Sequence, residues 1–163
     1  MIAHDEPELA REELLYLVAD CRAFFPAHNL LGDLAIAEDK LNVARGHFGF
    51  VYELTMQALG TNFHGRLPAT RGYNQHFFQA GKSLARCLAT LGNLDEAADL
   101  LRQLLKLDPR EVELRELLDE CELARRPGDA VVQLVSLQLP ISPTALADNR
   151  DDDLADEEDD HDD

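Results

Sequence analysis

The sequence has no tryptophan, few aromatic residues and no long apolar run. Aromatic residues make up 6% and hydrophobic residues 45% of the 163 residues, so we expect a core built mainly from Leu, Ala and Val. A transmembrane helix needs about 20 consecutive apolar residues, and the N-terminus lacks the basic and then apolar order of a signal peptide. The length predicts one folded domain. These absences predict a cytoplasmic protein without a membrane partner.

Residues that build metal and catalytic sites are also scarce. Cys21, Cys87 and Cys121 lie far apart and form no CxxC pair, which argues against a disulfide framework or a zinc site. We interpret them as buried free thiols on helices. His47, His64 and His76 lack metal-ligand spacing, and no HExxH, EF-hand, P-loop, GxGxxG or GxSxG motif occurs. The sequence therefore predicts no metal, no cofactor and no enzymatic activity.

Acidic residues are abundant but unevenly placed. The chain has 32 acidic and 15 basic residues, a net charge of −17, and eleven of the acidic residues lie in residues 144–163. Such a segment cannot bury enough apolar surface to fold. We therefore predict a helical domain over residues 1–142 and a disordered acidic tail over residues 143–163. The negative charge repels phosphate, which argues against a nucleic-acid partner.

The clearest structural signal is a helical hairpin and a third helix in residues 75–122. Apolar residues recur there at spacings of three and four, as on one face of a helix. The three stripes are Leu84, Ala85, Leu88 and Leu91, then Leu94, Ala97, Ala98, Leu101, Leu104 and Leu105, then Val112, Leu114, Leu117, Leu118, Cys121 and Leu123.

Capping residues mark the ends of these helices. Asn74 is the predicted N-cap of the first helix and Gly92 its C′ residue, because glycine adopts the left-handed conformation without a Cβ clash. Asn93 and Glu96 have the spacing of a capping box at the start of the second helix. Asp108-Pro109 is predicted to begin the third helix, with Asp108 as the N-cap and the proline at N1.

The remaining chain has weaker signals. We expect a first helix over residues 5–25, a turn over residues 26–32, and a helical region over residues 33–59 with a bend or a junction of two helices at Arg45-Gly46. A close helix approach is the favoured role for Gly46 and Gly49. Residues 60–73 are predicted to form a long loop. Residues 130–139 fit a helix or a strand, and we favour the helix because a strand would have no partner.

The hairpin resembles a known family. The run Gly92–Ala97, followed by Leu105, Leu107 and Asp108-Pro109, resembles the second half of a tetratricopeptide repeat. Its register starts at Phe78 and places Gly81 where the family has a large aromatic residue and Leu88 where it has a tyrosine. The resemblance covers one unit, residues 78–111, whose neighbours must complete the core. It implies an all-α fold, a short tetratricopeptide-like stack (α-solenoid) of about five to seven helices; a generic helical hairpin is the alternative.

Basic residues gather in a window without acidic ones. Residues 54–94 contain no Asp or Glu, and Lys82 and Arg86 share a helix face because they are four apart. The repeat register places Lys82 and Arg86 on the inner groove with Gln79, Ala89 and Thr90. We predict that a local anion-binding surface includes Arg66 and Arg71 of the loop. The alternative is an ordinary solvated face.

These features favour a protein–protein interaction module, an adaptor, co-chaperone or assembly factor that binds a partner segment in a helical groove. The resemblance implies a partner with an acidic or C-terminal segment, which Lys82 and Arg86 would bind. A self-associating protein that completes its core by oligomerisation is one alternative, and a secretion-type chaperone is another. The acidic tail is predicted either to occupy the basic surface or only to aid solubility.

Overall fold

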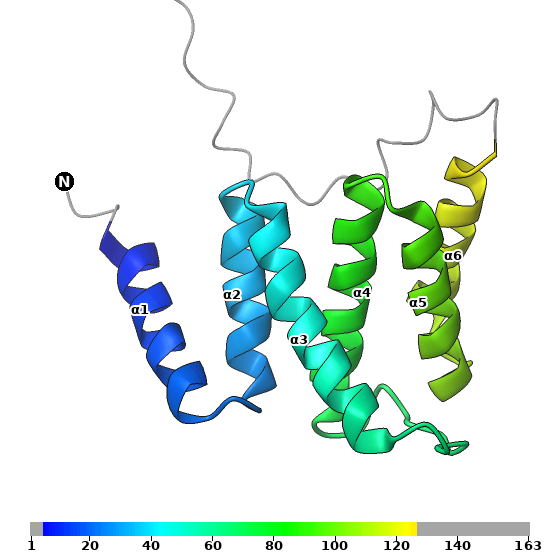
Figure 1. The fold of residues 1–163 in the computed structure, drawn as a ribbon, viewed down its shortest axis with the longest axis horizontal. Coiled ribbons are helices and arrows are strands. Elements are labelled where there is room, and N and C mark those ends of the chain that lie inside the picture. The colour runs from blue at the N-terminus through cyan, green and yellow to red at the C-terminus, as the bar shows by residue number, and fades with distance from the viewer. Residues whose placement is uncertain (1–4, 127–163) are drawn as a thin grey trace, which may run out of the picture.

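The computed structural model describes residues 5–126, which form six α-helices and no strand (Figure 1). They are α1 (Asp5–Asp20), α2 (Phe25–Ala37), α3 (Leu41–Leu59), α4 (Asn74–Thr90), α5 (Leu94–Leu107) and α6 (Val112–Ala124). The all-α prediction is confirmed. The predicted tail and residues 130–139 lie outside the described part of the chain. No helix within residues 5–126 is both long and apolar enough to cross a bilayer.

The helices form two layers. Each helix packs against the next, while α2 also contacts α4 and α4 contacts α6. No Cα atom of α3 lies within 8 Å of one in α1 or α5. The α2, α4 and α6 axes are therefore closer together than those of the other layer. We expect the stack to curve toward this α2–α4–α6 layer, as stacked helix pairs do in solenoids.

The first hairpin, α2–α3, repeats the second, α4–α5, at an offset of 53 positions. Leu31, Gly32, Ala44 and Phe48 correspond in this way to Leu84, Ala85, Ala97 and Leu101. All eight are buried, and Gly32 lies directly against the Phe48 ring of the other helix of its hairpin. The offset of 53 positions is present in the sequence, but it was not recognised because matching positions differ in residue type, as Gly32 and Ala85 do.

The two hairpin turns have the same geometry. Asp39 and Gly92 both have left-handed backbones, with φ of 57° and 86°. The following amide bonds back to the helix in both, Lys40 to the Ala35 carbonyl and Asn93 to the Leu88 carbonyl, at 2.8 Å each. This is the Schellman pattern of a helix C-terminus. The predicted stop at Gly92 is confirmed.

The predicted boundaries before residue 60 were wrong in three places. The turn expected over residues 26–32 belongs to α2, since Pro26 lies in its first turn, where a missing N–H costs nothing. The junction expected at Arg45-Gly46 lies instead at residues 38–40, because Asp39 takes the left-handed conformation usually left to glycine. The first helix also ends at Asp20, five residues early.

The predicted caps were only partly correct. Asn93 occupies the N-cap position of α5 but makes no side-chain capping bond. Asn74 is the first residue of α4, and its side chain donates to the Pro68 carbonyl at 3.1 Å. Glu111, rather than Asp108, is the N-cap residue of α6. Asp108 is engaged with the loop before α4 instead.

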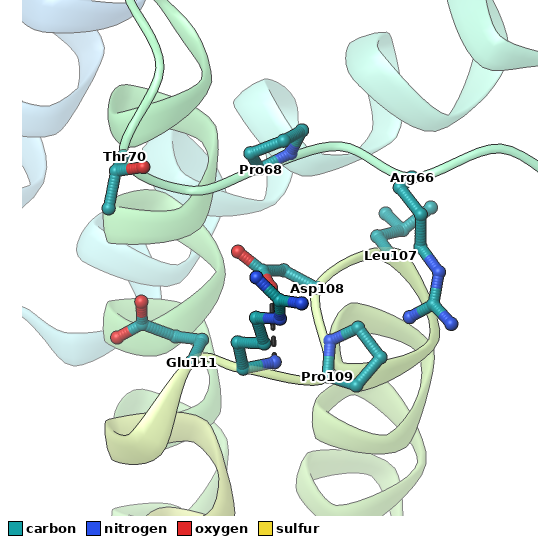
Figure 2. Close-up of a pocket in the computed structure, with 8 residues that line it drawn as sticks. Arg66, Pro68, Thr70, Leu107, Asp108, Pro109 and Glu111 are labelled. Atoms are coloured by element: carbon teal, nitrogen blue, oxygen red, sulfur yellow. Dashed lines mark hydrogen bonds between the residues drawn. The ribbon is translucent and has the colours of Figure 1, made fainter.

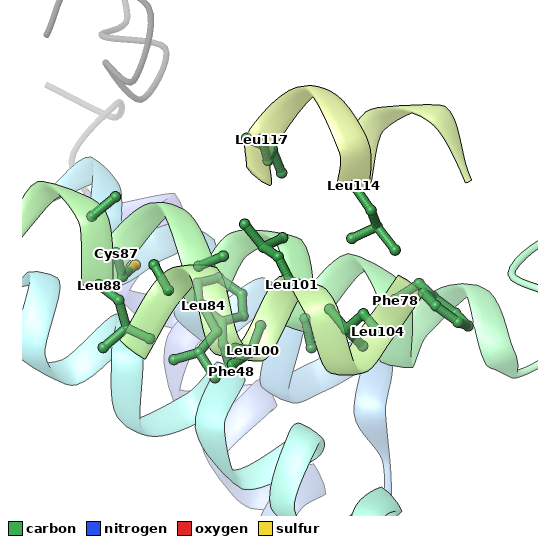
Figure 3. Packing of buried hydrophobic residues seen from close by; sticks show 14 of the residues in the cluster. Phe48, Phe78, Leu84, Cys87, Leu88, Leu100, Leu101, Leu104, Leu114 and Leu117 are labelled. Atoms are coloured by element: carbon green, nitrogen blue, oxygen red, sulfur yellow. The ribbon is translucent and has the colours of Figure 1, made fainter. Parts of the chain in front are cut away.

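The core of the described residues consists mainly of Leu and Ala, as predicted, together with three buried phenylalanines (Figure 3). Valine, which was also expected there, contributes only Val51 to the buried residues of this part of the chain. Glycine permits the two closest helix approaches. A Cβ at Gly32 would lie 2.4 Å from the Phe48 ring, and one at Gly81 would lie 2.6 Å from Leu104 Cδ1. A Cβ at Gly46 would meet nothing within 4 Å, so the close approach predicted there was wrong.

The cysteines differ in their surroundings. Cys87 and Cys121 are buried, as predicted, whereas Cys21 is exposed and follows the end of α1. Burial, with the nearby Asp33 charge, raises the pKa of Cys87 to about 11. Its thiol is therefore protonated at neutral pH and has a packing role.

Candidate functional site

Basic side chains on α4 meet acidic side chains at the start of α6. Lys82 Nζ lies 2.5 Å from Glu113 Oε2 and 3.5 Å from Glu111 Oε1, and Arg86 Nη2 lies 2.6 Å from Glu113 Oε1. These four residues are called the α4–α6 ion-pair cluster below. The shared contact with Glu113 confirms that Lys82 and Arg86 lie on one helix face.

The cluster is partly shielded from solvent. The Lys82 side chain is 19% exposed and that of Glu113 is 40% exposed. Partial burial acts to raise the pKa of the Glu113 carboxyl, but hydrogen bonds from Lys82 and Arg86 outweigh it and hold that pKa below its ordinary value of 4.5. Glu113 is therefore ionised at neutral pH. Its negative charge partly neutralises Lys82 and Arg86, which the sequence analysis had treated as an uncompensated basic surface.

The other residues of the predicted binding surface are more dispersed. Gln79 and Thr90 are exposed on α4, and Thr90 Oγ1 donates to the Arg86 carbonyl at 2.9 Å. Ala89 is buried and cannot line an open surface. Arg66 and Arg71 are both exposed in the loop, but only Arg66 lines the pocket described next. An anion-binding role for this set stays a prediction.

A pocket of about 550 Å³ lies between the loop of residues 60–73 and the α5–α6 turn (Figure 2). Two basic residues, Arg66 and Arg110, lie on its wall with Thr70 and Glu111. The remaining lining residues are Pro68, Leu107, Asp108 and Pro109. Glu111 also belongs to the ion-pair cluster, so the pocket and the cluster adjoin and form one candidate site.

Asp108 holds the loop that forms one wall of this pocket. Its Oδ2 accepts a hydrogen bond from the Ala69 amide at 2.8 Å, and its Oδ1 accepts one from the Arg110 amide at 3.1 Å. The Leu67 amide donates to the Leu107 carbonyl at 3.0 Å. The long loop is thus attached to the α5–α6 turn and positions Arg66 there.

Sequence reasoning missed Glu111 and Glu113 as site residues. They follow the acid-free window by more than fifteen positions, and no local pattern links them to Lys82 or Arg86. Asp108 was noticed, but as a helix cap. The spacing of the repeat could have indicated the contact, since it places α6 beside α4 as α4 lies beside α2.

A pair of histidines lies inside the first hairpin. His28 Nδ1 and His47 Nδ1 are 3.4 Å apart, and His28 Nε2 lies 3.1 Å from the Arg22 carbonyl oxygen. A carbonyl only accepts, so neutral His28 carries its proton on Nε2 and accepts at Nδ1 from His47. Burial lowers the pKa of both imidazoles below 6.5, and the His28 charge lowers that of His47 further.

This pair predicts a pH-dependent stability. Because the folded-state pKa values are lowered, the unfolded chain binds more protons as the pH falls through 6.5. The free energy of unfolding should then hold above about pH 7 and fall below pH 6.5. Chemical denaturation of wild type and His47→Gln from about pH 7 down to about pH 5 tests this. The free energy of unfolding of the variant should fall less steeply with decreasing pH than that of wild type. His64→Gln, in the exposed loop, is the matched control, and an equal slope in all three proteins would contradict the prediction.

Comparison with known proteins identifies one segment. The family model of the tetratricopeptide repeat matches residues 78–118, which cover α4 from Phe78, all of α5 and the first half of α6. The match is about a quarter of the chain. No curated protein and no solved structure matches the sequence.

Proposed function

The chain carries a tetratricopeptide-like repeat within an all-α stack, and we propose that it is a non-enzymatic protein–protein interaction module whose α2–α4–α6 layer binds an extended segment of a partner. The partner segment would present an acidic side chain or a terminal carboxylate to Lys82 and Arg86. Arg66 and the adjoining pocket would receive the neighbouring residues of that segment.

The α4–α6 ion-pair cluster carries this proposal. Two cations converge on one carboxylate at 2.5 and 2.6 Å, and this arrangement supports Lys82 and Arg86 as the groups that would bind a partner carboxylate. Partly exposed ion pairs contribute little net stability, about 0–1 kcal/mol. A partner carboxylate can therefore replace Glu113 at small cost, since it restores the contacts that it breaks.

The pocket supplies the second part of the argument. Its volume of about 550 Å³ lies in the ordinary range for ligand sites. Leu107 and the two prolines Pro68 and Pro109 give it apolar walls, and Arg66 and Arg110 add cationic groups. This combination suits an extended peptide that carries an acidic residue beside an apolar one.

Selection of peptides from a random phage-displayed library on the purified chain tests the proposal. We expect enrichment of acidic or carboxyl-terminal sequences, and a synthetic peptide from that set should bind about tenfold more weakly to Arg86→Glu, which loses a charged contact. Lys106→Glu makes the same charge change on an exposed position of α5 and should bind like wild type. Equal binding to wild type and Arg86→Glu would remove this site from the proposal.

Glu113→Gln gives a complementary result. It removes the competing carboxylate and should raise the affinity for the same acidic peptide several-fold, with a thermal midpoint close to that of wild type. A lower affinity for the acidic peptide would show that Glu113 orders the site rather than competes for it. Binding of basic peptides in place of acidic ones would reverse the proposed charge of the partner.

A further inference from the structure

Among the described residues 5–126, helix α1 is covered on one side only. Of the other five helices it packs against α2 alone, whereas α3 lies between α2 and α4, and α5 lies between α4 and α6. Figure 1 shows α1 at one end of the stack, with no described helix beyond it. The stack repeats as α1, α3, α5 and as α2, α4, α6, so the contact of α1 with α2 matches that of α3 with α4. The face of α1 away from α2 therefore corresponds to the face of α3 that packs on α2.

That face of α1 carries large apolar side chains. Leu9 is 59% exposed and Tyr16 is 77% exposed, and their spacing of seven places them on the same side of the helix. Leu15 and Leu17 flank them and are 46% and 44% exposed. The residues that face α2 are Leu14 and Val18, which are only partly exposed. A helix with apolar residues on both sides is typical of a position between two neighbours.

The border of the exposed face is acidic. Glu12, Glu13 and Asp20 are exposed and lie within a helical turn or so of Leu9 and Tyr16. The only basic residue of α1 is Arg11, which pairs with Glu38 of the α2–α3 turn. A second copy of this chain would bring identical carboxylates against these residues and be repelled, whereas a cationic partner would be attracted.

We propose that this face of α1, formed by Leu9, Tyr16 and the bordering Glu12, Glu13 and Asp20, docks a basic amphipathic helix of another protein. The incoming helix would take the position against α1 that α2 holds against α3. Its apolar stripe would cover Leu9 and Tyr16, and its Lys or Arg residues would meet the acidic border. This surface is separate from the α2–α4–α6 layer, so both could be occupied together.

A labelled amphipathic peptide of Leu and Lys, about five helical turns long, is a suitable probe for fluorescence anisotropy at physiological salt. The full chain should bind it, and Leu9→Ser/Tyr16→Ser should bind it about tenfold more weakly. Glu12→Gln/Glu13→Gln should bind more weakly with a shallower salt dependence. The acidic residues 151–163 are present in every variant, so their attraction for the peptide is common to all.

Val112→Ser is the matched control, because Val112 is 62% exposed on α6 and away from α1. It should bind the peptide like wild type, and circular dichroism should show the same helix content in all variants. Equal binding by wild type and Leu9→Ser/Tyr16→Ser overturns the proposal, as does equal affinity for a peptide with Glu in place of Lys. A concentration-dependent dimer that Leu9→Ser/Tyr16→Ser abolishes would assign the face to a second copy instead.

Discussion

Gly32→Ala is expected to lower the free energy of unfolding by about 2 kcal/mol. The new Cβ would lie 2.4–2.8 Å from three atoms of the Phe48 ring, which is fully buried and cannot move aside. Overpacking of this kind costs about 1–3 kcal/mol, occasionally more, and exceeds the gain of roughly 1 kcal/mol that alanine brings to a helix interior. Urea denaturation followed by circular dichroism measures the change.

Gly46→Ala is the control with the opposite sign. Gly46 lies in the middle of α3 with nothing within 4 Å of an added Cβ, so only the helix-propensity gain remains, about 1 kcal/mol of stabilisation. Phe48→Leu in the Gly32→Ala background should recover part of the loss by making room for the methyl group. Equal stability of Gly32→Ala and Gly46→Ala would show that the two helices do not approach as closely as described.

Asp108→Ala is expected to destabilise the chain by about 2 kcal/mol and to release the loop of residues 60–73. The substitution removes a charged acceptor from two backbone amides, those of Ala69 and Arg110, and hydrogen bonds to charged groups contribute about 1.5–3 kcal/mol each when buried. Asp108 is only half-buried, which lowers the sum. Hydrogen exchange at the Ala69 amide should become at least tenfold faster.

Asp99→Ala is the matched control for this substitution. Asp99 is also an acidic residue in an ion pair, but its side chain is 72% exposed and, among the described residues, bonds only to Arg102 of the same helix, so the change should be within about 0.5 kcal/mol. If Asp108→Ala also weakens the binding of the acidic peptide selected from the library, the loop that carries Arg66 belongs to the binding site. Unchanged exchange at Ala69 would contradict the role assigned to Asp108.

Local sequence patterns were sufficient for the second hairpin. The apolar stripes of α4 and α5 and the left-handed residue Gly92 depend on neighbours within a few positions, and all three are as predicted. The same reasoning failed in the first hairpin, where Asp39 takes the left-handed position without glycine and Gly46 lies in an unbroken helix. The glycines at 46 and 49 were therefore a misleading guide to the first hairpin. Its turn is at Asp39, and its close helix approach is at Gly32.

Contacts between distant residues were beyond local patterns. Tyr73 Oη accepts from the Phe25 amide at 2.9 Å and donates to the Ala23 carbonyl at 3.0 Å, and so helps to begin α2 from a position 48 residues away. In the sequence, Pro26 could equally follow the end of one helix or lie in the first turn of the next. The Tyr73 hydroxyl is among the contacts that favour the second arrangement, and only the tertiary structure shows that Tyr73 lies there.

The sequence by itself determined that the chain is helical, that its second hairpin resembles a tetratricopeptide repeat, and that Lys82 and Arg86 share a face. The tertiary structure alone decided that Glu113 lies between those two cations, that Asp108 holds the loop beside them, and that α1 presents Leu9 and Tyr16 outward. The physical reason is that periodicity and caps act over one or two turns. Ion pairs and exposed faces depend instead on how separate helices are stacked.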